Sequence, residues 1–304
     1  MGENVLKFGT YVRVGNAAEA YELLQKNRNN KIVGGGIWMR LGSRRVATAI
    51  DLSACGLDQI EETETEFRIG AMCTLRQLER HAELNALVNH VFEFAVRDIV
   101  GVQLRNTATV GGSIYGRFGF SDVLSAFLAL DSYVELTGAG RVPLAEFVRM
   151  GFVRDVIERI VVVKHDYRAS CEAVRKAATD FPSLNVTAAW WDNSWHVTVG
   201  ARPLRATLLQ GEACGLVNER PSEDELRALA ASVRALSYGT NLWGSAEYRR
   251  RISAPLAVQA VRRAAGIELS AALARELEGV QIPQFATDEY SCRRVSGVDS
   301  SEVR

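Results

Sequence analysis

The sequence predicts two successive domains that each combine helices with strands. In the N-terminal half, short strand-like segments alternate with helix-like segments, which favours a mixed α/β arrangement. In the C-terminal half, a hairpin pattern is followed by two long helices. The composition changes between residues 166 and 179, and we place the domain boundary there. The predicted units are residues 1–165, residues 166–272 and a polar tail over residues 273–304.

Capping residues mark the first helices. Asn16 and Thr74 each precede a segment with helical periodicity, and their side chains are suited to cap it. Short apolar segments that end at glycine or polar residues read as strands. In order, the sequence predicts a helix over 16–27, a strand and turn over 31–36, strands over 47–52 and 66–69, and helices over 75–82 and 84–98.

The later elements begin after a loop at residues 105–121. The run WWDNSWHVTV predicts a hairpin, because polar turn residues separate two apolar segments. Ser222, after a proline, starts a helix. The expected elements are a helix over 122–130, strands over 132–136 and 159–164, a hairpin of 184–191 with 195–199, and helices over 222–236 and 246–266.

The charge balance limits the partners of this chain. Its 304 residues contain 36 Lys plus Arg and 36 Asp plus Glu, so the formal net charge is zero. Nucleic acids and anionic membranes demand a basic surface, which this composition does not supply. The N-terminus lacks the pattern of a signal peptide, and no window approaches the roughly 20 apolar residues of a membrane span. We therefore expect a cytoplasmic protein.

The cysteines and histidines show no metal-binding pattern. The five cysteines lie far apart, whereas the ligands of an iron–sulfur cluster usually come in tight runs. The four histidines show neither metal-type spacing nor a pairing with Ser or Cys. We expect no metal site and no catalytic side chain in this chain.

A first glycine-rich loop follows a short strand in the run KIVGGGIW at residues 31–38. Glycine adopts positive φ and has no Cβ, so consecutive backbone N–H groups can converge on an anion such as pyrophosphate. The run matches neither the GxGxxG pattern nor the P-loop. A plain tight turn explains the three glycines equally well.

A second loop, QLRNTATVGGSI at residues 103–114, is richer in possible ligand groups. The hydroxyls of Thr109 and Ser113 flank paired glycines and can donate to phosphate or polyol oxygens. Nine residues after Ser113, Asp122 opens an apolar helix. Its carboxylate can cap that helix or accept hydrogen bonds from ligand hydroxyls, and the two roles are compatible.

The second loop resembles a motif of a known flavoprotein family. TVGGSI at 109–114, preceded by LRN at 104–106 and followed by SDVL at 121–124, is similar to the second FAD motif of the xanthine dehydrogenase/carbon monoxide dehydrogenase flavoproteins. VGGGI at 33–37 resembles the first motif of that family, AGGTDL. KAATDFP at 176–182, VGARP at 199–203 and AEYR at 246–249 continue the resemblance, which covers about residues 5–266.

This resemblance implies an α+β fold, with a two-part FAD-binding domain of the vanillyl-alcohol oxidase (PCMH) type followed by a small domain of antiparallel strands plus helices. It implies non-covalently bound FAD, and no histidine lies beside either loop to form a covalent link. The two loops would hold the pyrophosphate and ribityl chain, Asp122 the ligand hydroxyls, Ile160 the adenine side, and Lys176 would lie near the flavin edge. The implied cofactor-binding residues are Ile32, Val33, Gly34, Gly35, Gly36, Ile37, Thr109, Gly111, Gly112, Ser113, Asp122, Ile160 and Lys176.

Three stretches depart from the family pattern. Gly36 and Ile37 replace the usual Thr/Ser-Asp pair, so contacts there would come from the backbone alone. Ser113 stands where Asn is usual. RFGF at 117–120 replaces a small, proline-containing stretch. Phe118 and Phe120, with Tyr115, could pack on the flavin ring or in a core or interface.

The resemblance also implies partner chains. In this family a molybdenum centre oxidises the substrate, two [2Fe–2S] clusters pass the electrons on, and FAD delivers them to NAD+ or another acceptor. This chain has neither cluster cysteines nor room for a molybdopterin domain. The expected partners are therefore a molybdopterin-binding large subunit and a [2Fe–2S] small subunit. Two other hypotheses stay open: a free-standing FAD-dependent oxidase, and a non-catalytic scaffold subunit that lost the cofactor.

Overall fold

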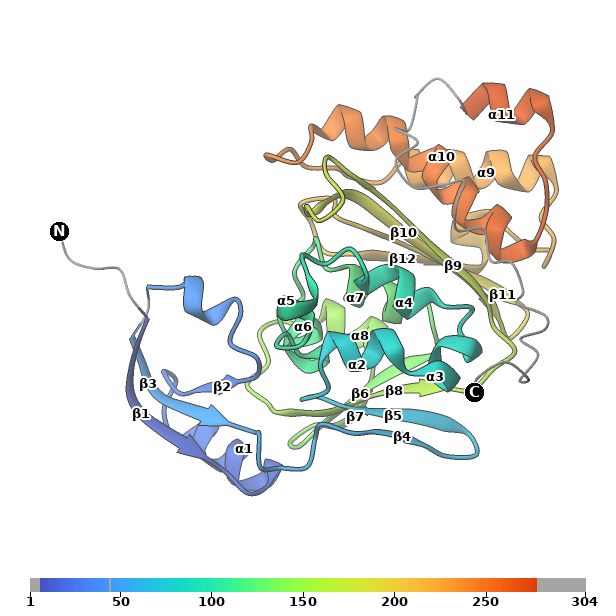
Figure 1. Ribbon diagram of the computed structural model, residues 1–304. Coiled ribbons are helices and arrows are strands. Elements are labelled where there is room, and N and C mark those ends of the chain that lie inside the picture. Colours follow the sequence, from blue (N-terminus) through green and yellow to red (C-terminus); the bar gives the residue numbers. More distant parts are fainter. Residues whose placement is uncertain (1–5, 44, 278–304) are drawn as a thin grey trace, which may run out of the picture.

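The computed structural model describes residues 6–43 and 45–277. Its N-terminal unit is a three-stranded parallel sheet in the order β1–β3–β2 (Figure 1). Helix α1 begins where the Asn16 side chain accepts a hydrogen bond from the Glu19 N–H at 2.9 Å, as the sequence predicts. The elements of this unit are β1 (Lys7–Arg13), α1 (Ala17–Lys26), β2 (Lys31–Val33), the 3-10 helix η1 (Met39–Leu41) and β3 (Arg45–Asp51).

The middle of the chain forms a five-stranded antiparallel sheet in the order β4–β5–β8–β6–β7, with short helices packed on it. The strands are β4 (Ile60–Glu62), β5 (Glu66–Gly70), β6 (Ser132–Leu136), β7 (Gly140–Pro143) and β8 (Ile157–Val163). The helices are α2 (Leu75–Arg80), α3 (Ala82–Leu87), α4 (Val91–Val96), α5 (Val102–Arg105), α6 (Val110–Tyr115), α7 (Asp122–Leu128) and α8 (Leu144–Arg149).

The last part is a four-stranded antiparallel sheet in the order β12–β11–β10–β9, with helices beyond it. The predicted hairpin is present, and Asp192 and Asn193 form its turn with φ of 46° and 54°. The elements are β9 (Arg168–Arg175), β10 (Pro182–Trp191), β11 (Ser194–Gly200), β12 (Thr207–Gln210), the 3-10 helix η2 (Gly211–Cys214), α9 (Glu223–Arg234), α10 (Ala246–Ala265) and α11 (Ala271–Leu277).

The four-stranded sheet lies between two layers of helices. Helices α4 and α7 of the middle part contact the sheet from below in Figure 1, and α10 covers it from above. Strand β10 is accordingly buried over most of its length. The four-stranded sheet is therefore attached to the N-terminal domain through α4 and α7. This contact between the two domains borders the site described below.

Several elements differ from the sequence prediction; strand β1, for example, was not expected. The expected helix over 84–98 is two helices, α3 and α4, separated by Asn89 and His90 at φ of 51° and 63°. The buried Asn85 side chain joins them, because it donates to the Leu78 carbonyl and accepts from the Glu93 N–H. The expected loop over 105–121 contains helix α6. Strand β9 lies in the stretch where only a change of composition was visible.

One predicted domain limit lies between two sheets, and the other lies inside a helix. The limit after residue 165 lies between β8 of the five-stranded sheet and β9 of the four-stranded sheet. The limit after residue 272 lies inside α11, so the tail does not begin there: Leu273 and Leu277 are buried in the core of the second domain. The rest of the predicted tail, residues 278–304, lies outside the described residues. Among the described helices, none is long and apolar enough to cross a membrane.

Candidate functional site

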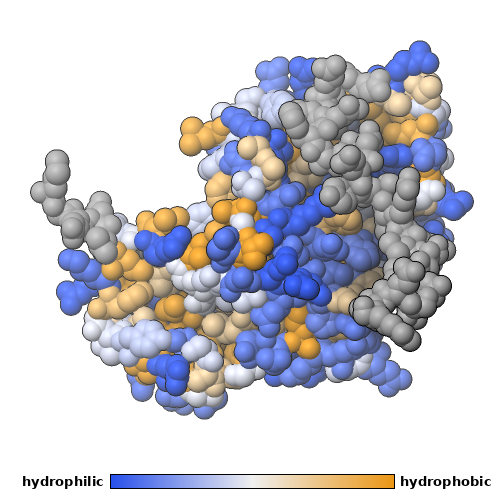
Figure 2. Space-filling view, viewed as in Figure 1, coloured by the Kyte–Doolittle hydropathy of each residue, from blue (hydrophilic) through white to orange (hydrophobic). Residues whose placement is uncertain are grey.

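A large cavity lies between the N-terminal unit, the short helices and the edge of the second domain. Its volume is about 620 Å³, within the range of roughly 300–1,000 Å³ that is usual for ligand pockets. Figure 2 shows the surface hollowed between the N-terminal unit and the second domain, with apolar side chains gathered there. Both glycine-rich loops line the cavity. The structure therefore brings the two motifs, about 70 residues apart in sequence, to one site.

The first loop, residues 34–38, needs its glycines for contact with the second loop. A Cβ on Gly35 would lie 1.8 Å from the Thr107 carbonyl oxygen, and a Cβ on Gly34 would lie 2.6 Å from Thr109 Oγ1. Gly36 has φ of +68°, a backbone conformation that favours glycine, and no atom of the described residues lies within 4 Å of the position that a Cβ would take. The glycines of this loop thus serve two purposes, a close approach between loops and a left-handed turn.

The first loop also presents backbone donors that the chain does not use. Within the described residues, none of the N–H groups from residue 34 to residue 38 donates a hydrogen bond to the protein. The loop is fixed from its other side, because the Gly36 carbonyl accepts from the Arg40 N–H at 3.0 Å. Unpaired N–H groups that face a cavity are suited to bind an anionic ligand.

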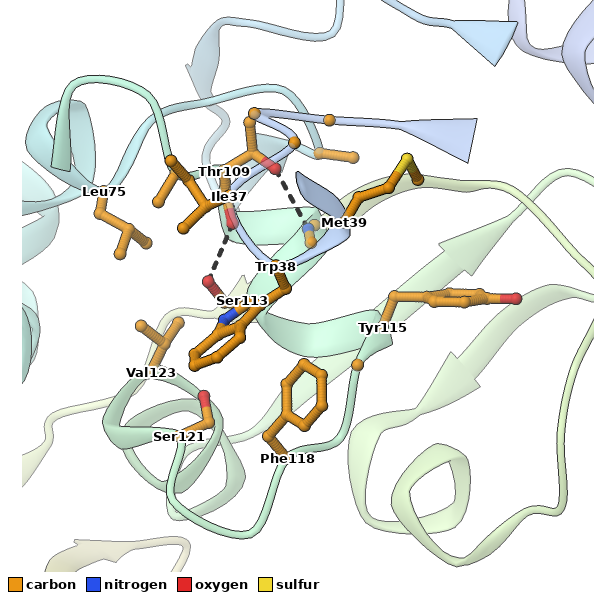
Figure 3. A pocket seen from close by; sticks show the side chains of 18 of the residues that line it. Ile37, Trp38, Met39, Leu75, Thr109, Ser113, Tyr115, Phe118, Ser121 and Val123 are labelled. Carbon is orange, nitrogen blue, oxygen red and sulfur yellow. Dashed lines mark hydrogen bonds between the residues drawn. The ribbon is translucent and has the colours of Figure 1, made fainter. Parts of the chain in front are cut away.

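The second loop, residues 107–113, differs from the first in that most of its hydrogen-bond donors have partners within the protein. Thr109 caps α6, and its Oγ1 accepts from the Gly112 N–H at 3.2 Å, while the Ser113 hydroxyl donates to the Thr109 carbonyl at 2.9 Å (Figure 3). The Val110 and Gly111 N–H groups donate to Cys73 and Ala71 at 2.8 and 2.9 Å. A Cβ on Gly111 would lie 2.6 Å from the Ala71 Cβ. This loop lines the cavity, but the N–H groups of Val110, Gly111 and Gly112 are already hydrogen-bonded within the protein.

Asp122 takes a role that the sequence did not reveal. Ser121, not Asp122, caps α7 by accepting from the Leu124 N–H at 3.1 Å. The Asp122 carboxylate accepts from Arg175 Nη2 at 2.8 Å and from Asn185 Nδ2 at 2.7 Å. Burial raises the pKa of the Asp122 carboxyl, and these two partners oppose that rise. Asp122 lies at the cavity, but both of its oxygens are engaged in joining α7 to the second domain.

The charges around the cavity favour an anionic ligand. The carboxylates of Asp155 and Asp180 are already hydrogen-bonded: Asp155 accepts from three backbone N–H groups, and Asp180 accepts from the indole of Trp243. Lys31 and Arg40 also line the cavity, and neither forms an ion pair within residues 6–43 and 45–277. Lys31 and Arg40 therefore add positive charge to the cavity lining without an acidic partner among the described residues.

Aromatic side chains form the wall at one end of the cavity. Trp38, Phe118, Phe120 and Phe181 line it, and Figure 3 shows the Trp38 and Phe118 rings side by side. Tyr115 points away from them and donates to the Val153 carbonyl. The sequence had suggested Phe118 and Phe120, but Trp38 and Phe181 were missed. For Trp38, its place two residues after the third glycine was the available clue.

Three expected site residues, Val33, Ile160 and Lys176, lie outside the cavity lining. Ile160 is fully buried at the centre of the five-stranded sheet, between β5 and β6, so its side chain belongs to the core. Ile157, three residues earlier on β8, lines the cavity instead. Lys176 is exposed, and its Nζ donates to the Leu242 carbonyl at 2.7 Å. Val33 ends β2 opposite Asp51, just before the cavity-lining glycines.

Comparison with protein families identifies the fold that carries this cavity. Residues 6–164 match the model of the FAD binding domain in molybdopterin dehydrogenase. The chain belongs to this family. The predicted family, α+β fold class and oxidoreductase class are confirmed, and FAD is its cofactor, as predicted.

Relatives and solved structures agree with this assignment. The chain is 24% identical over 270 residues to the alpha subunit of the 6-hydroxypseudooxynicotine dehydrogenase complex of Paenarthrobacter nicotinovorans, an alignment that covers 80% of this chain and 89% of the relative. A carbon monoxide dehydrogenase chain from Hydrogenophaga pseudoflava shares the fold with a TM-score of 0.76 and 20% identity over 85% of this chain and 97% of that one. A chain of quinoline 2-oxidoreductase from Pseudomonas putida 86 gives 0.74 and 17%, over 86% and 98%.

The cavity fits this cofactor. A dinucleotide carries a pyrophosphate dianion between two flat ring systems. The cavity offers unpaired N–H groups at the first loop, the cations Lys31 and Arg40 in its lining, and apolar and aromatic walls. The residues that would hold the pyrophosphate are those of the first loop with Lys31 and Arg40. The second loop would supply the wall behind them.

Proposed function

We propose that this chain is the FAD-carrying subunit of a multi-subunit molybdenum hydroxylase, through which electrons from [2Fe–2S] clusters of a partner subunit reach NAD+ or another acceptor. The observation that supports it is the convergence of both family motifs, within the matched residues 6–164, on one cavity suited to a dinucleotide. We also propose the cytoplasm as its location, from the sequence alone.

The residues of this chain bind and orient the cofactor. When bound, FAD supplies the redox chemistry, since it exchanges electrons singly or in pairs. The protein fixes it through the N–H groups of residues 34–38, neutralises its charge with Lys31 and Arg40, and surrounds its rings with the aromatic wall. No side-chain acid or base is required for such a role.

The names of the similar proteins support the proposal that this chain is one subunit of a larger complex. One relative is a subunit of a dehydrogenase complex, and one structural neighbour is a carbon monoxide dehydrogenase that lacks the Mo-pyranopterin part of its molybdenum cofactor. We infer that this chain likewise works beside a molybdopterin-binding large subunit and a [2Fe–2S] small subunit. The specificity for a substrate would then reside in the large subunit.

The test is purification of the full chain from its native source through an affinity tag, with identification of the accompanying chains. We expect flavin absorbance at about one flavin per chain, released on denaturation as non-covalent FAD, together with partner chains that contain molybdenum and iron. A colourless chain that stays alone and does not take up added FAD would contradict the proposal and favour the scaffold hypothesis. A yellow chain without partners that oxidises a small substrate would favour the free-standing oxidase.

The acceptor is tested with the same preparation. If NAD+ is the acceptor, NADH added without oxygen should bleach the flavin absorbance, because hydride transfer between the two cofactors is reversible. Dithionite serves as the control that every bound flavin is reducible. Bleaching by dithionite but not by NADH would assign the electrons to another acceptor.

A further inference from the structure

One side chain of the aromatic wall, Trp38, comes from the loop that holds the free donors. Trp38 follows residues 34–37 directly, lines the cavity and keeps 43% of its surface exposed. An indole with so much exposed surface inside a ligand cavity has room for a further contact. Within the described residues its indole N–H makes no hydrogen bond that holds it in place.

Three phenylalanine rings pack against Trp38. Its ring centroid lies 5.4 Å from Phe118, 5.2 Å from Phe120 and 5.8 Å from Phe181, with interplanar angles of 45°, 49° and 35°. Phe118 and Phe120 are stacked on each other at 5.2 Å and 9°. Trp38 is therefore tilted against all three neighbours and stacked on none of them, while 43% of its surface stays exposed.

The backing of this aromatic wall is fixed by the second domain. Phe181 packs on Trp243 at 4.9 Å, and the Trp243 indole donates to Asp180 Oδ1 at 2.7 Å. The buried Arg249 guanidinium holds the loop that carries Trp243, because it donates to the Gly239 and Gly244 carbonyls. The wall is thus anchored on its second-domain side. Trp38, which comes from the first loop, and Phe118 are its exposed members.

We propose that Trp38 is a cofactor-binding residue whose indole packs against the isoalloxazine ring of the bound flavin. This inference rests on the proposed function. The indole is electron-rich and the oxidised isoalloxazine ring is electron-poor, so contact between their faces is favourable. Because Trp38 follows the proposed pyrophosphate donors in the chain, the aromatic wall lies close enough to them to receive one of the two ring systems of the dinucleotide. The adenine half then belongs at the aliphatic end of the cavity, near Ile32, Leu52 and Ile157.

The experiment compares flavin binding and flavin emission in the full chain, kept with its accompanying chains, and in the variants Trp38→Phe, Trp38→Ala and Trp190→Phe. Trp190 lies in the second domain, 5.6 Å from Trp195 and outside the cavity lining, so Trp190→Phe is the matched control. Tryptophan in contact with a flavin quenches its fluorescence by electron transfer, whereas phenylalanine does not.

We expect dim flavin emission in the wild type and in Trp190→Phe, and bright, longer-lived emission in Trp38→Phe at similar affinity. Trp38→Ala should bind FAD about tenfold more weakly, the loss expected for one aromatic contact. Emission that does not change in Trp38→Phe would overturn the proposal, and so would weaker binding without a change of emission, which would place Trp38 beside the adenine. If Trp38→Ala does not fold, Trp38→Phe still decides. If the wild type itself binds no FAD, the proposed function fails, and the role of Trp38 fails with it.

Discussion

The two glycine-rich loops lie side by side at one cavity, but they use their glycines and their donors in opposite ways. In the second loop, the N–H groups of Val110, Gly111 and Gly112 all have partners within the chain. In the first loop, the N–H groups of residues 34–38 have none among the described residues. The second loop carries the more specific family motif, and the first loop carries the free donors. A distinctive motif can therefore mark the packing behind a site more strongly than the contacts made in it.

The largest expected effect concerns Asp122, which the sequence assigned to ligand hydroxyls and the structure joins to Arg175. Asp122→Asn should destabilise the folded chain by about 3 kcal/mol, because it leaves a buried guanidinium without its carboxylate. Denaturant unfolding measures this. Asp98→Asn is the control: its ion pair with Arg97 is half exposed and 3.9 Å long, so its loss should cost less than about 1 kcal/mol. Unchanged stability together with weaker FAD binding would instead show that Asp122 binds the ligand.

The next effect tests the contact between the two loops. Gly35→Ala should lower stability by about 2 kcal/mol and abolish FAD binding, since the added Cβ collides with the Thr107 carbonyl and pushes the loops apart. Thermal unfolding and FAD titration of the same sample measure both results. Gly15→Ala is the matched control, because no heavy atom of the part of the chain that the structure describes lies within 4 Å of its added Cβ. Normal FAD binding by Gly35→Ala would show that the loops do not depend on each other.

A smaller effect separates folding from binding in the second loop. Thr109→Val removes the hydroxyl that caps α6 and should cost about 1 kcal/mol of stability, while the folded protein keeps its affinity for FAD. Thr109→Ser retains the capping oxygen and should restore most of that stability. A loss of FAD affinity in Thr109→Val at full stability would mean that the hydroxyl serves the ligand instead.

The smallest effect is expected at Ser113, which stands where the family usually has Asn. Its hydroxyl donates to the Thr109 carbonyl inside α6, so Ser113→Ala should change stability by less than about 0.5 kcal/mol. FAD affinity, measured by titration, should stay the same. Weaker binding by Ser113→Ala would instead give the second loop a direct contact with the cofactor.

Local chemistry made much of the fold predictable from the sequence. Asn16, Thr74 and Ser222 cap the helices that they were expected to start, and Gly266 ends α10 at φ of +63°. These features depend on a few neighbouring residues, which the sequence displays directly. The hairpin turn at Asp192 and Asn193 is of the same kind.

The predictions from the sequence were wrong or incomplete where residues far apart in the chain determine the structure. Strand β9 has little apolar alternation of its own, and it is a strand because β10 pairs with it. Asp122 and Arg175 are 53 residues apart, so no local pattern showed that the carboxylate was already engaged. The role of Ile160 came from the family resemblance alone, and the packing of β5, β8 and β6 puts its side chain in the core.

The central claim is that the first loop, not the second, supplies the donors for FAD. Amide hydrogen exchange of the full chain, with and without FAD, tests it directly. Without FAD, the N–H groups of residues 34–38 should exchange quickly and those of residues 110–113 slowly, because only the latter have hydrogen-bond partners among the described residues. Added FAD should slow exchange at residues 34–38 and leave residues 110–113 nearly unchanged. New protection at residues 110–113 with none at 34–38 would contradict the account.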